Sequence, residues 1–196
     1  MNQSNQWDAL SQFFDTSKSE DDLPSGIAEN ILIAWPVLLR ILETYVPPKK
    51  RTHVLEYGCG GGGFANKLHS LGYDVVGIDT SANMIEVAKK SYGQHGTFLT
   101  GDLRTANQFA LFDAITAIMV LQFIKDIEAA FTSFSDLVSL NGIFAFAVFN
   151  PDNVVARLKA RTFFQNFDSD THPTKGEIQF DSGVTIPVYI RTVEEY

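Results

Sequence analysis

Apolar and polar positions follow two periods along this chain of 196 residues. Short, continuous apolar runs predict buried strands at residues 54–57, 73–78, 96–100, 112–119 and 143–149. Between these runs, apolar residues recur at three- and four-residue steps, which predicts amphipathic helices over residues 64–71, 84–92 and 127–138. Strands that alternate with helices in this way indicate an α/β fold, with a doubly wound, mostly parallel sheet flanked by helices.

The N-terminal part of the chain predicts two more helices. The first carries its large apolar side chains on one face: Trp7, Leu10, Phe13 and Phe14. We expect this short helix either to pack on the domain or to cover a ligand. The second has the stronger amphipathic spacing, at Ile27, Ile31, Trp35, Leu38 and Leu42. Because proline lacks an N–H group and clashes with the preceding turn, Pro36 must kink this helix or begin a new segment.

The C-terminal part predicts a hairpin, with strands at residues 177–180 and 184–190 around an Asp-Ser-Gly turn. Pro187 indicates that the second strand lies at an edge. Residues 192–196 resemble the opening of a helix, and we hypothesise that the natural chain continues beyond them. The fifth predicted strand would then expose an apolar edge, through which two copies could pair as a homodimer, unless the hairpin covers it.

Length and composition indicate one domain over residues 1–196. Within it we distinguish an N-terminal helical cap (1–48), a core sheet (49–150), and a cap segment with the hairpin (151–196). The formal net charge of −8 argues against a nucleic-acid partner. We find no signal peptide and no apolar run of membrane-spanning length, and we therefore expect a cytoplasmic protein without a membrane partner. A single cysteine excludes an internal disulfide, and the histidines show no metal-ligand spacing.

A glycine-rich turn at residues 58–63 follows the first strand and precedes a helix. Glycine reaches positive φ without strain and lets a ligand approach the main chain. The helix that follows offers free N–H groups to that ligand. Gly58, Gly60 and Gly63 satisfy G-x-G-x-x-G, and Asp79 follows the next strand about twenty residues later, where nucleotide folds place an acid that binds ribose. Asp79 could instead cap the next helix, or serve both roles.

Residues 54–60, Val-Leu-Glu-Tyr-Gly-Cys-Gly, resemble motif I of class I S-adenosylmethionine (SAM)-dependent methyltransferases. Residues 101–103, Gly-Asp-Leu, resemble the adenine-binding corner of that family, and residues 112–124 resemble its motif IV. The resemblance implies SAM as the cofactor, S-adenosylhomocysteine as the product and an unidentified small-molecule acceptor. The cofactor-binding residues that it implies are Glu56, Gly58, Cys59, Gly60, Gly62, Asp79, Thr80, Met84, Asp102, Leu103, Ile118 and Met119.

The resemblance implies that Glu56 holds the amino group of the methionine part, that Asp79 holds the ribose, and that Asp102 holds the adenine. Many members of the family carry a polar residue in place of Ile118 and a histidine in place of Gln122. No general base stands out, and Gln122 is the candidate that could orient the acceptor through its amide. His172 lies in a predicted loop, where an exposed histidine is the simpler interpretation.

Two other functions remain open at this point. An NAD-dependent oxidoreductase would use the same glycines and Asp79, but it gives Asp102 no role. A regulatory protein could keep the fold and bind SAM without turnover, since the departures at Ile118 and Gln122 weaken the catalytic interpretation. Aromatic residues at positions 7, 13, 163 and 164 suggest an apolar or planar acceptor, but such residues are equally typical of a core. The acceptor atom and the oligomeric state are left undecided.

Overall fold

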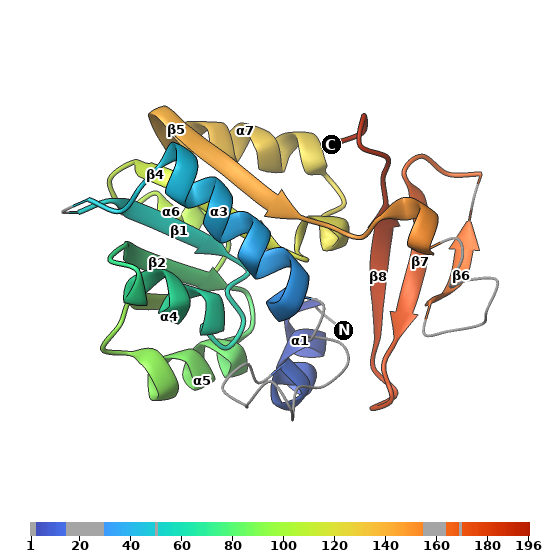
Figure 1. Ribbon diagram of the computed structural model, residues 1–196. Coiled ribbons are helices and arrows are strands. Elements are labelled where there is room, and N and C mark those ends of the chain that lie inside the picture. The colour runs from blue at the N-terminus through green and yellow to red at the C-terminus, as the bar shows by residue number, and fades with distance from the viewer. Residues whose placement is uncertain (1–2, 15–29, 50, 155–163, 169) are drawn as a thin grey trace.

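A five-stranded parallel sheet forms the centre of the protein, with strand order β3-β2-β1-β4-β5 (Figure 1). The computed structural model describes residues 3–14, 30–49, 51–154, 164–168 and 170–196. The strands are β1 (His53–Tyr57), β2 (Asp74–Asp79), β3 (Thr97–Thr100), β4 (Phe112–Ile118) and β5 (Val138–Ala147). The predicted doubly wound, parallel α/β fold is confirmed.

Helices cover both faces of this sheet (Figure 1). One face packs against α3 (Trp35–Tyr45), α4 (Gly63–Ser70) and α5 (Ala82–Tyr92). The other packs against α6 (Leu103–Ala106) and α7 (Ile127–Leu137). Because both faces are covered, the inner strands are apolar along nearly their whole length, which is why they read as continuous runs in the sequence.

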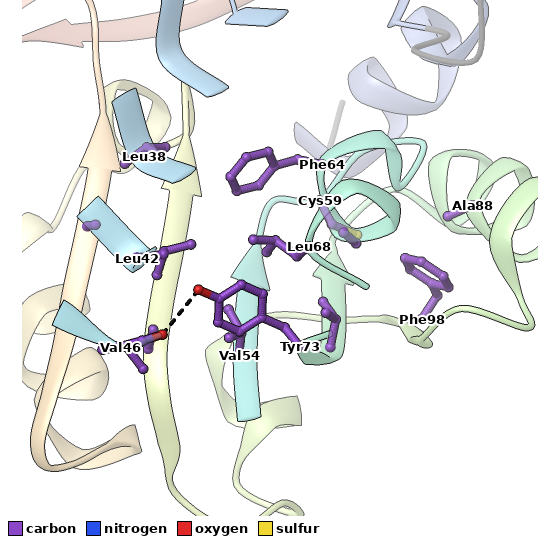
Figure 2. Close-up of a cluster of buried hydrophobic side chains, with 14 of the residues drawn as sticks. Leu38, Leu42, Val46, Val54, Cys59, Phe64, Leu68, Tyr73, Ala88 and Phe98 are labelled. Atoms are coloured by element: carbon purple, nitrogen blue, oxygen red, sulfur yellow. Dashed lines mark hydrogen bonds between the residues drawn. The ribbon is translucent and has the colours of Figure 1, made fainter. Parts of the chain in front are cut away.

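Figure 2 shows the core between α3, α4 and the sheet. Leu38 and Leu42 of α3 lie over the sheet, and Phe64 and Leu68 of α4 pack beside them. Tyr73 fills the base of this cluster, and its hydroxyl donates to the Val46 carbonyl oxygen at 3.1 Å, where α3 has just ended. This bond satisfies a polar group in an apolar core, and it fixes the start of β2 beside the end of α3.

Pro36 lies at the start of a new helical segment, which is one of the two alternatives that the sequence left open, the other being a kink within one helix. It lies in the first turn of α3, where its missing N–H group breaks no helical hydrogen bond. A short π-helix, η3 (Asn30–Ala34), precedes it. Ile27, which we assigned to the same amphipathic pattern, lies outside the described residues.

β5 begins at Val138, immediately after α7, so Asn141 and Gly142, a pair typical of the end of a helix, do not cap α7. The two residues lie inside β5, and the backbone of Asn141 has φ 70°. The pairing of β4 with β5 shifts register between Phe112 and Ala114, and the extra residues of β5 are accommodated there. A Cβ on Gly142 would lie 2.9 Å from the Asp113 carbonyl oxygen, so the close approach of the two strands requires glycine.

A second, antiparallel sheet with order β6-β7-β8 stands beyond the ends of the parallel strands (Figure 1). Its strands are β6 (Phe164–Asp168), β7 (Thr174–Gln179) and β8 (Thr185–Ile190). The predicted hairpin is confirmed as β7–β8, and Pro187 lies on the edge strand β8. The hairpin does not pair with β5, which remains at the edge of the parallel sheet. The helix predicted to open at residue 192 is not formed, and Tyr196 instead packs against Phe146.

Arg191, at the end of β8, joins the two sheets. Its side chain is only 3% exposed, and its guanidinium donates to the carbonyl oxygens of Leu121, Ile124 and Lys125 at 3.4, 2.8 and 2.9 Å. These carbonyls belong to the turn that follows β4, which includes the 3₁₀ helix η4 (Leu121–Phe123). A buried guanidinium is therefore satisfied by main-chain oxygens, and the turn after β4 is held against the antiparallel sheet.

The N-terminal helix α1 (Gln3–Leu10) bridges the same two parts of the molecule, and the 3₁₀ helix η1 (Ser11–Phe14) continues it. The Asp8 carboxylate accepts from the Ser81 hydroxyl at 2.6 Å and from the Asn83 N–H at 3.1 Å, at the start of α5. On the other side, the Gln6 amide donates to the Thr185 carbonyl oxygen at 2.7 Å. The helix therefore packs on the domain and also spans from α5 to β8.

Candidate functional site

The turn between β1 and α4 requires glycine at three positions with positive φ. These are Gly58, Gly60 and Gly62, with φ of 70°, 51° and 81°. The Gly58 and Cys59 N–H groups donate to the Ile78 carbonyl oxygen at 2.7 and 3.1 Å, which ties the turn to β2. A Cβ on Gly60 would meet no heavy atom within 4 Å. The main chain at Gly60 is therefore bare toward open space, as a close-fitting ligand requires.

A large cavity opens beside this turn, at the carboxyl ends of β1 and β4. Its volume is about 890 Å³, and its lining includes Gly58, Gly60 and Gly61. The strand order changes direction between β1 and β4, which is the place where ligands bind in open parallel sheets. From the glycine turn the cavity extends between α3 and η4 to the antiparallel sheet.

Asp79, the last residue of β2, places its carboxylate in the cavity wall. One oxygen accepts from the Gly60 N–H at 2.9 Å, and the other accepts from the Ser81 N–H at 2.9 Å. Burial raises the pKa of this carboxyl, and the backbone bonds from Ser81 and Gly60 oppose the rise. The helix cap that we considered for Asp79 is supplied by Ser81, whose hydroxyl accepts from the Met84 N–H at 3.1 Å. Asp79 thus holds the glycine turn and lines the cavity.

Glu56 lies in the wall at the base of the turn and is only 4% exposed. Its Oε2 has no hydrogen-bond partner among the described residues. Burial raises the pKa of Glu56 well above its ordinary value of 4.5, a backbone bond from Ala65 lowers it, and the charge of Asp79 raises it further. A buried carboxylate with an unfilled acceptor atom fits a cationic hydrogen-bond donor in the cavity.

The raised pKa of Glu56 predicts how stability depends on pH. The folded protein binds a proton at Glu56 more strongly than the unfolded chain, so the free energy of unfolding should fall as pH rises from about 4.5 through the raised pKa. Glu56→Gln should remove this fall and leave the protein at pH 8 as stable as the wild type or more stable, by on the order of 1 kcal/mol. Urea unfolding at several pH values checks this, with the exposed Glu86→Gln as control. An unchanged pH slope in Glu56→Gln would contradict the assignment.

The end of β4 contributes the opposite wall. Met119 has φ 56°, and its N–H donates to the Ala147 carbonyl oxygen at 2.7 Å, so that the chain turns sharply into η4. Gln122 follows in η4, lines the cavity and is 1% exposed. Both amide atoms of Gln122 lack a hydrogen-bond partner among the described residues. An unsatisfied buried amide is costly, and it therefore points to a ligand-dependent role.

The structure gathers most of the sequence-predicted site residues around the cavity. Its lining includes Glu56, Gly58, Cys59, Gly60, Asp79, Thr80, Met84, Ile118, Met119 and Gln122. Three predicted residues lie outside the lining. Gly62 packs toward Ala88 and Phe98, Leu103 is buried in the first turn of α6, and Asp102 caps α6 and forms an exposed ion pair with Arg104 at 2.7 Å.

Sequence reasoning did not identify several aromatic residues of the cavity wall. They are Trp35, Phe64, Phe123, Phe146, Phe149 and Phe180. Each lies in an apolar stretch that is equally typical of a core, so no local signal separated them from it. His172 is exposed and does not line the cavity. Cys59 is buried, and its pKa is raised well above its ordinary value by burial and by the charges of Glu56 and Asp79, which makes it a poor nucleophile.

The part of the chain that the structure describes lacks two kinds of feature. No cluster of three or more histidine, cysteine, aspartate or glutamate residues there could hold a metal ion. None of the helices there has the length and apolar character that a membrane crossing needs.

Comparisons with known proteins agree with this geometry. Residues 32–186 match a family model described as a methyltransferase domain. The ubiquinone biosynthesis O-methyltransferase of Coxiella burnetii (strain Dugway 5J108-111) is 29% identical over 131 residues, which cover 65% of this chain and 56% of that protein. The enzyme of the same name from Pelagibacter ubique (strain HTCC1062) is 34% identical over 108 residues, covering 53% and 44%. The chain thus spans about half the length of the curated relatives it matches.

Solved structures share the fold at lower identity. The PH0226 protein from Pyrococcus horikoshii OT3 has a TM-score of 0.68 and 22% identity, with 95% of this chain and 84% of that chain covered. A complex titled DhpI-SAM-HEP has a TM-score of 0.65 and 20% identity, with 97% and 82% covered. These likenesses extend over the antiparallel sheet as well as the parallel one, because nearly the whole chain is covered.

Proposed function

Because the chain belongs to the family described as a methyltransferase domain, we propose that it moves a methyl group from SAM to a small-molecule acceptor. Membership of this family decides against the oxidoreductase alternative. The observation that carries the proposal is Glu56, which presents an unfilled carboxylate oxygen in the wall of a cavity beside a bare glycine turn. The structure titled as a SAM complex, with the same fold, supports SAM as the cofactor.

The residues of the cavity fit SAM part by part. Glu56 would accept hydrogen bonds from the ammonium group of the methionine part, which satisfies its free Oε2. Gly60 would let the ribose approach the main chain, and Asp79 would accept from the ribose hydroxyls while its Gly60 and Ser81 bonds hold it in place. We propose the same cofactor role for the other predicted residues of the lining, namely Gly58, Cys59, Thr80, Met84, Ile118 and Met119.

We propose that the adenine end of the cofactor lies at the start of α6. Asp102 pairs with Arg104, and its pKa is lowered chiefly by that side-chain hydrogen bond. Asp102 and Leu103 would reach adenine only if Arg104, which is fully exposed at its tip, turned away. Because exposed ion pairs are weak, this exchange is compatible with binding. Gly62 is proposed to act indirectly, by allowing α4 to pack close to Ala88.

The reaction asks little covalent chemistry of the protein. SAM supplies a methyl group on a positively charged sulfur, which leaves as a neutral thioether, so the electrophile comes from the cofactor. The described lining would hold the acceptor in a largely apolar space. Gln122 is proposed to orient the acceptor through its amide, since both of its polar atoms lack a partner among the described residues.

Calorimetric titration with SAM, S-adenosylhomocysteine and NAD in parallel tests the cofactor. We expect both adenosyl ligands to bind and NAD not to bind. Binding of NAD alone would refute the proposal. Binding of SAM without methyl transfer to any acceptor in a broad panel of small molecules would favour the regulatory alternative.

We propose a homodimer that pairs through the edge of β5, where Leu140 is 92% exposed and no strand follows in the sheet. Light scattering tests it, and a strict monomer at high concentration would count against it. The cytoplasmic location and the single-domain organisation stay predictions from the sequence.

A further inference from the structure

Six aromatic rings line one side of the cavity, from Phe14, whose main chain lies against Gly61 of the glycine turn, to the antiparallel sheet, and we call them the aromatic belt. They are Trp7, Phe14, Phe123, Phe149, Phe164 and Phe180. Trp7 is at the centre, with ring centroids 4.9 Å from Phe123, 5.9 Å from Phe14 and 6.4 Å from Phe180. The belt continues from Phe123 to Phe149 at 6.4 Å and from Phe149 to Phe164 at 5.4 Å. Neighbouring rings meet edge to face throughout.

The belt is built from segments outside the parallel sheet. Its rings come from α1, η1, η4, the residue pair after β5, and the antiparallel sheet. Phe164 is buried in the small core of that sheet, whereas the other belt rings are only partly buried. Edge-to-face packing leaves ring faces and edges available to a flat ligand, which can stack on one ring and meet the edge of the next.

The charge of the lining differs between its two ends. Among the described residues of the lining, the only carboxylates are Glu56 and Asp79, both beside the glycine turn. The described lining contains no lysine, arginine or histidine, and its polar residues away from the turn are the neutral Asn30, Asn150, Asn153 and Gln122. A charged ligand in the belt would lose its hydration without gaining a counter-ion from these residues.

Gln122 adds a specific polar requirement. It precedes the belt residue Phe123 in η4, and it offers one amide donor group and one carbonyl acceptor, neither of which has a partner among the described residues. A buried amide whose donor and acceptor groups form no hydrogen bond costs free energy. A ligand with one hydrogen-bonding group would recover part of that cost by bonding to the Gln122 amide.

We propose that the belt binds the acceptor as an uncharged, planar ring system with one hydrogen-bonding group, and that Gln122 selects that group. This inference rests on the proposed function, because it assigns the belt to the acceptor. The cofactor end and the acceptor end are then distinguished by charge, with both acidic residues at the cofactor and aromatic faces at the acceptor.

A matched ligand series tests the inference. It consists of naphthalene, 1-naphthol, 2-naphthol, 2-naphthoate and 2-naphthylmethylammonium, which share one ring system and differ in polarity and charge. Dissociation constants are measured by ligand-observed NMR on the full chain, with and without S-adenosylhomocysteine. We expect at least one naphthol to bind roughly 10-fold or more tightly than either charged compound. A charged compound loses its hydration in the belt, and the described lining there offers no counter-ion to offset that loss. Equal or tighter binding of a charged compound, or no binding of the neutral ones, would overturn the inference.

Two variants separate the belt from Gln122. Gln122→Leu replaces an unpartnered amide with an apolar group of similar size, so the fold should tolerate it. It should abolish the preference for naphthol over naphthalene and leave naphthalene binding unchanged. Phe180→Leu should weaken the binding of every neutral ligand in the series. Phe109 is a half-buried ring that does not line the cavity, so Phe109→Leu should leave the binding of all of them unchanged. An unchanged naphthol preference in Gln122→Leu would refute the role of Gln122.

The same experiment distinguishes failure of this inference from failure of the proposed function. If S-adenosylhomocysteine binds but the neutral rings do not, the acceptor assignment fails and the methyltransferase proposal stands. If the neutral rings bind selectively without S-adenosylhomocysteine binding, the belt selects as inferred, but the proposed function fails.

Discussion

Asp79→Ala should reduce the affinity for SAM at least about 100-fold, because charge-assisted hydrogen bonds are each worth about 1.5–3 kcal/mol and the variant loses those to the ribose. It also removes the bonds that Asp79 accepts from Gly60 and Ser81, so the glycine turn keeps its bonds to the Ile78 carbonyl but loses the one that positions Gly60. The loss of the ribose hydrogen bonds and the loss of the bond to Gly60 both weaken SAM binding. The fall in affinity should therefore exceed the effect of losing any single contact.

Calorimetry with SAM and with S-adenosylhomocysteine measures this effect. The matched control is Asp126→Ala, which removes a carboxylate that caps α7 through the Ala129 N–H at 3.0 Å and does not line the cavity. Asp126→Ala should lose about 1 kcal/mol of stability and keep its affinity for SAM. Affinity within threefold of the wild type in Asp79→Ala would refute the cofactor assignment.

Arg191→Met should lower the free energy of unfolding by about 2–4 kcal/mol, because one buried and two partly buried carbonyl oxygens lose the guanidinium as a donor. The three carbonyls belong to the turn after β4, and the guanidinium also lies 5.5 Å from the Tyr189 ring and 5.7 Å from the Tyr196 ring. Methionine keeps much of the apolar contact of the arginine stem, so the loss reports mainly on the polar head.

Urea unfolding measures the change, with Arg40→Met as control. Arg40 is exposed on α3, and its replacement should leave the unfolding midpoint where it is. A midpoint for Arg191→Met equal to that of the control would show that the turn after β4 is held by packing alone.

The parallel sheet could be predicted from the sequence because its inner strands are covered on both faces. Burial on both faces leaves a continuous apolar run, and this signal needs no knowledge of the partner strand. The start of β5 could not be predicted in the same way. Asn141 and Gly142 resemble the end of a helix locally, but their conformation is set by the register between β4 and β5, which is a long-range property.

The candidate site divides along the same line. The glycine turn, Glu56 and Asp79 lie within a few residues of strand ends, so their positions followed from the strand assignments. The aromatic wall did not, because Phe123, Phe149 and Phe180 meet only when the antiparallel sheet packs beside the parallel one. For Asp102 the motif predicts a ligand contact, which stays a prediction, and the structure adds an ion pair with Arg104 that the motif does not indicate.

The hydrogen bond from Gln6 to Thr185 joins residues that are 179 positions apart in the sequence. During synthesis on a ribosome it cannot form until residue 185 has emerged. The glycine turn and Asp79 are complete about a hundred residues earlier, as are the strands that hold them. The residues of the glycine turn and Asp79 can therefore fold on the nascent chain well before the opposite wall of the cavity has been synthesised. The cavity is completed only when the N-terminal helix and the last strands of the chain come together.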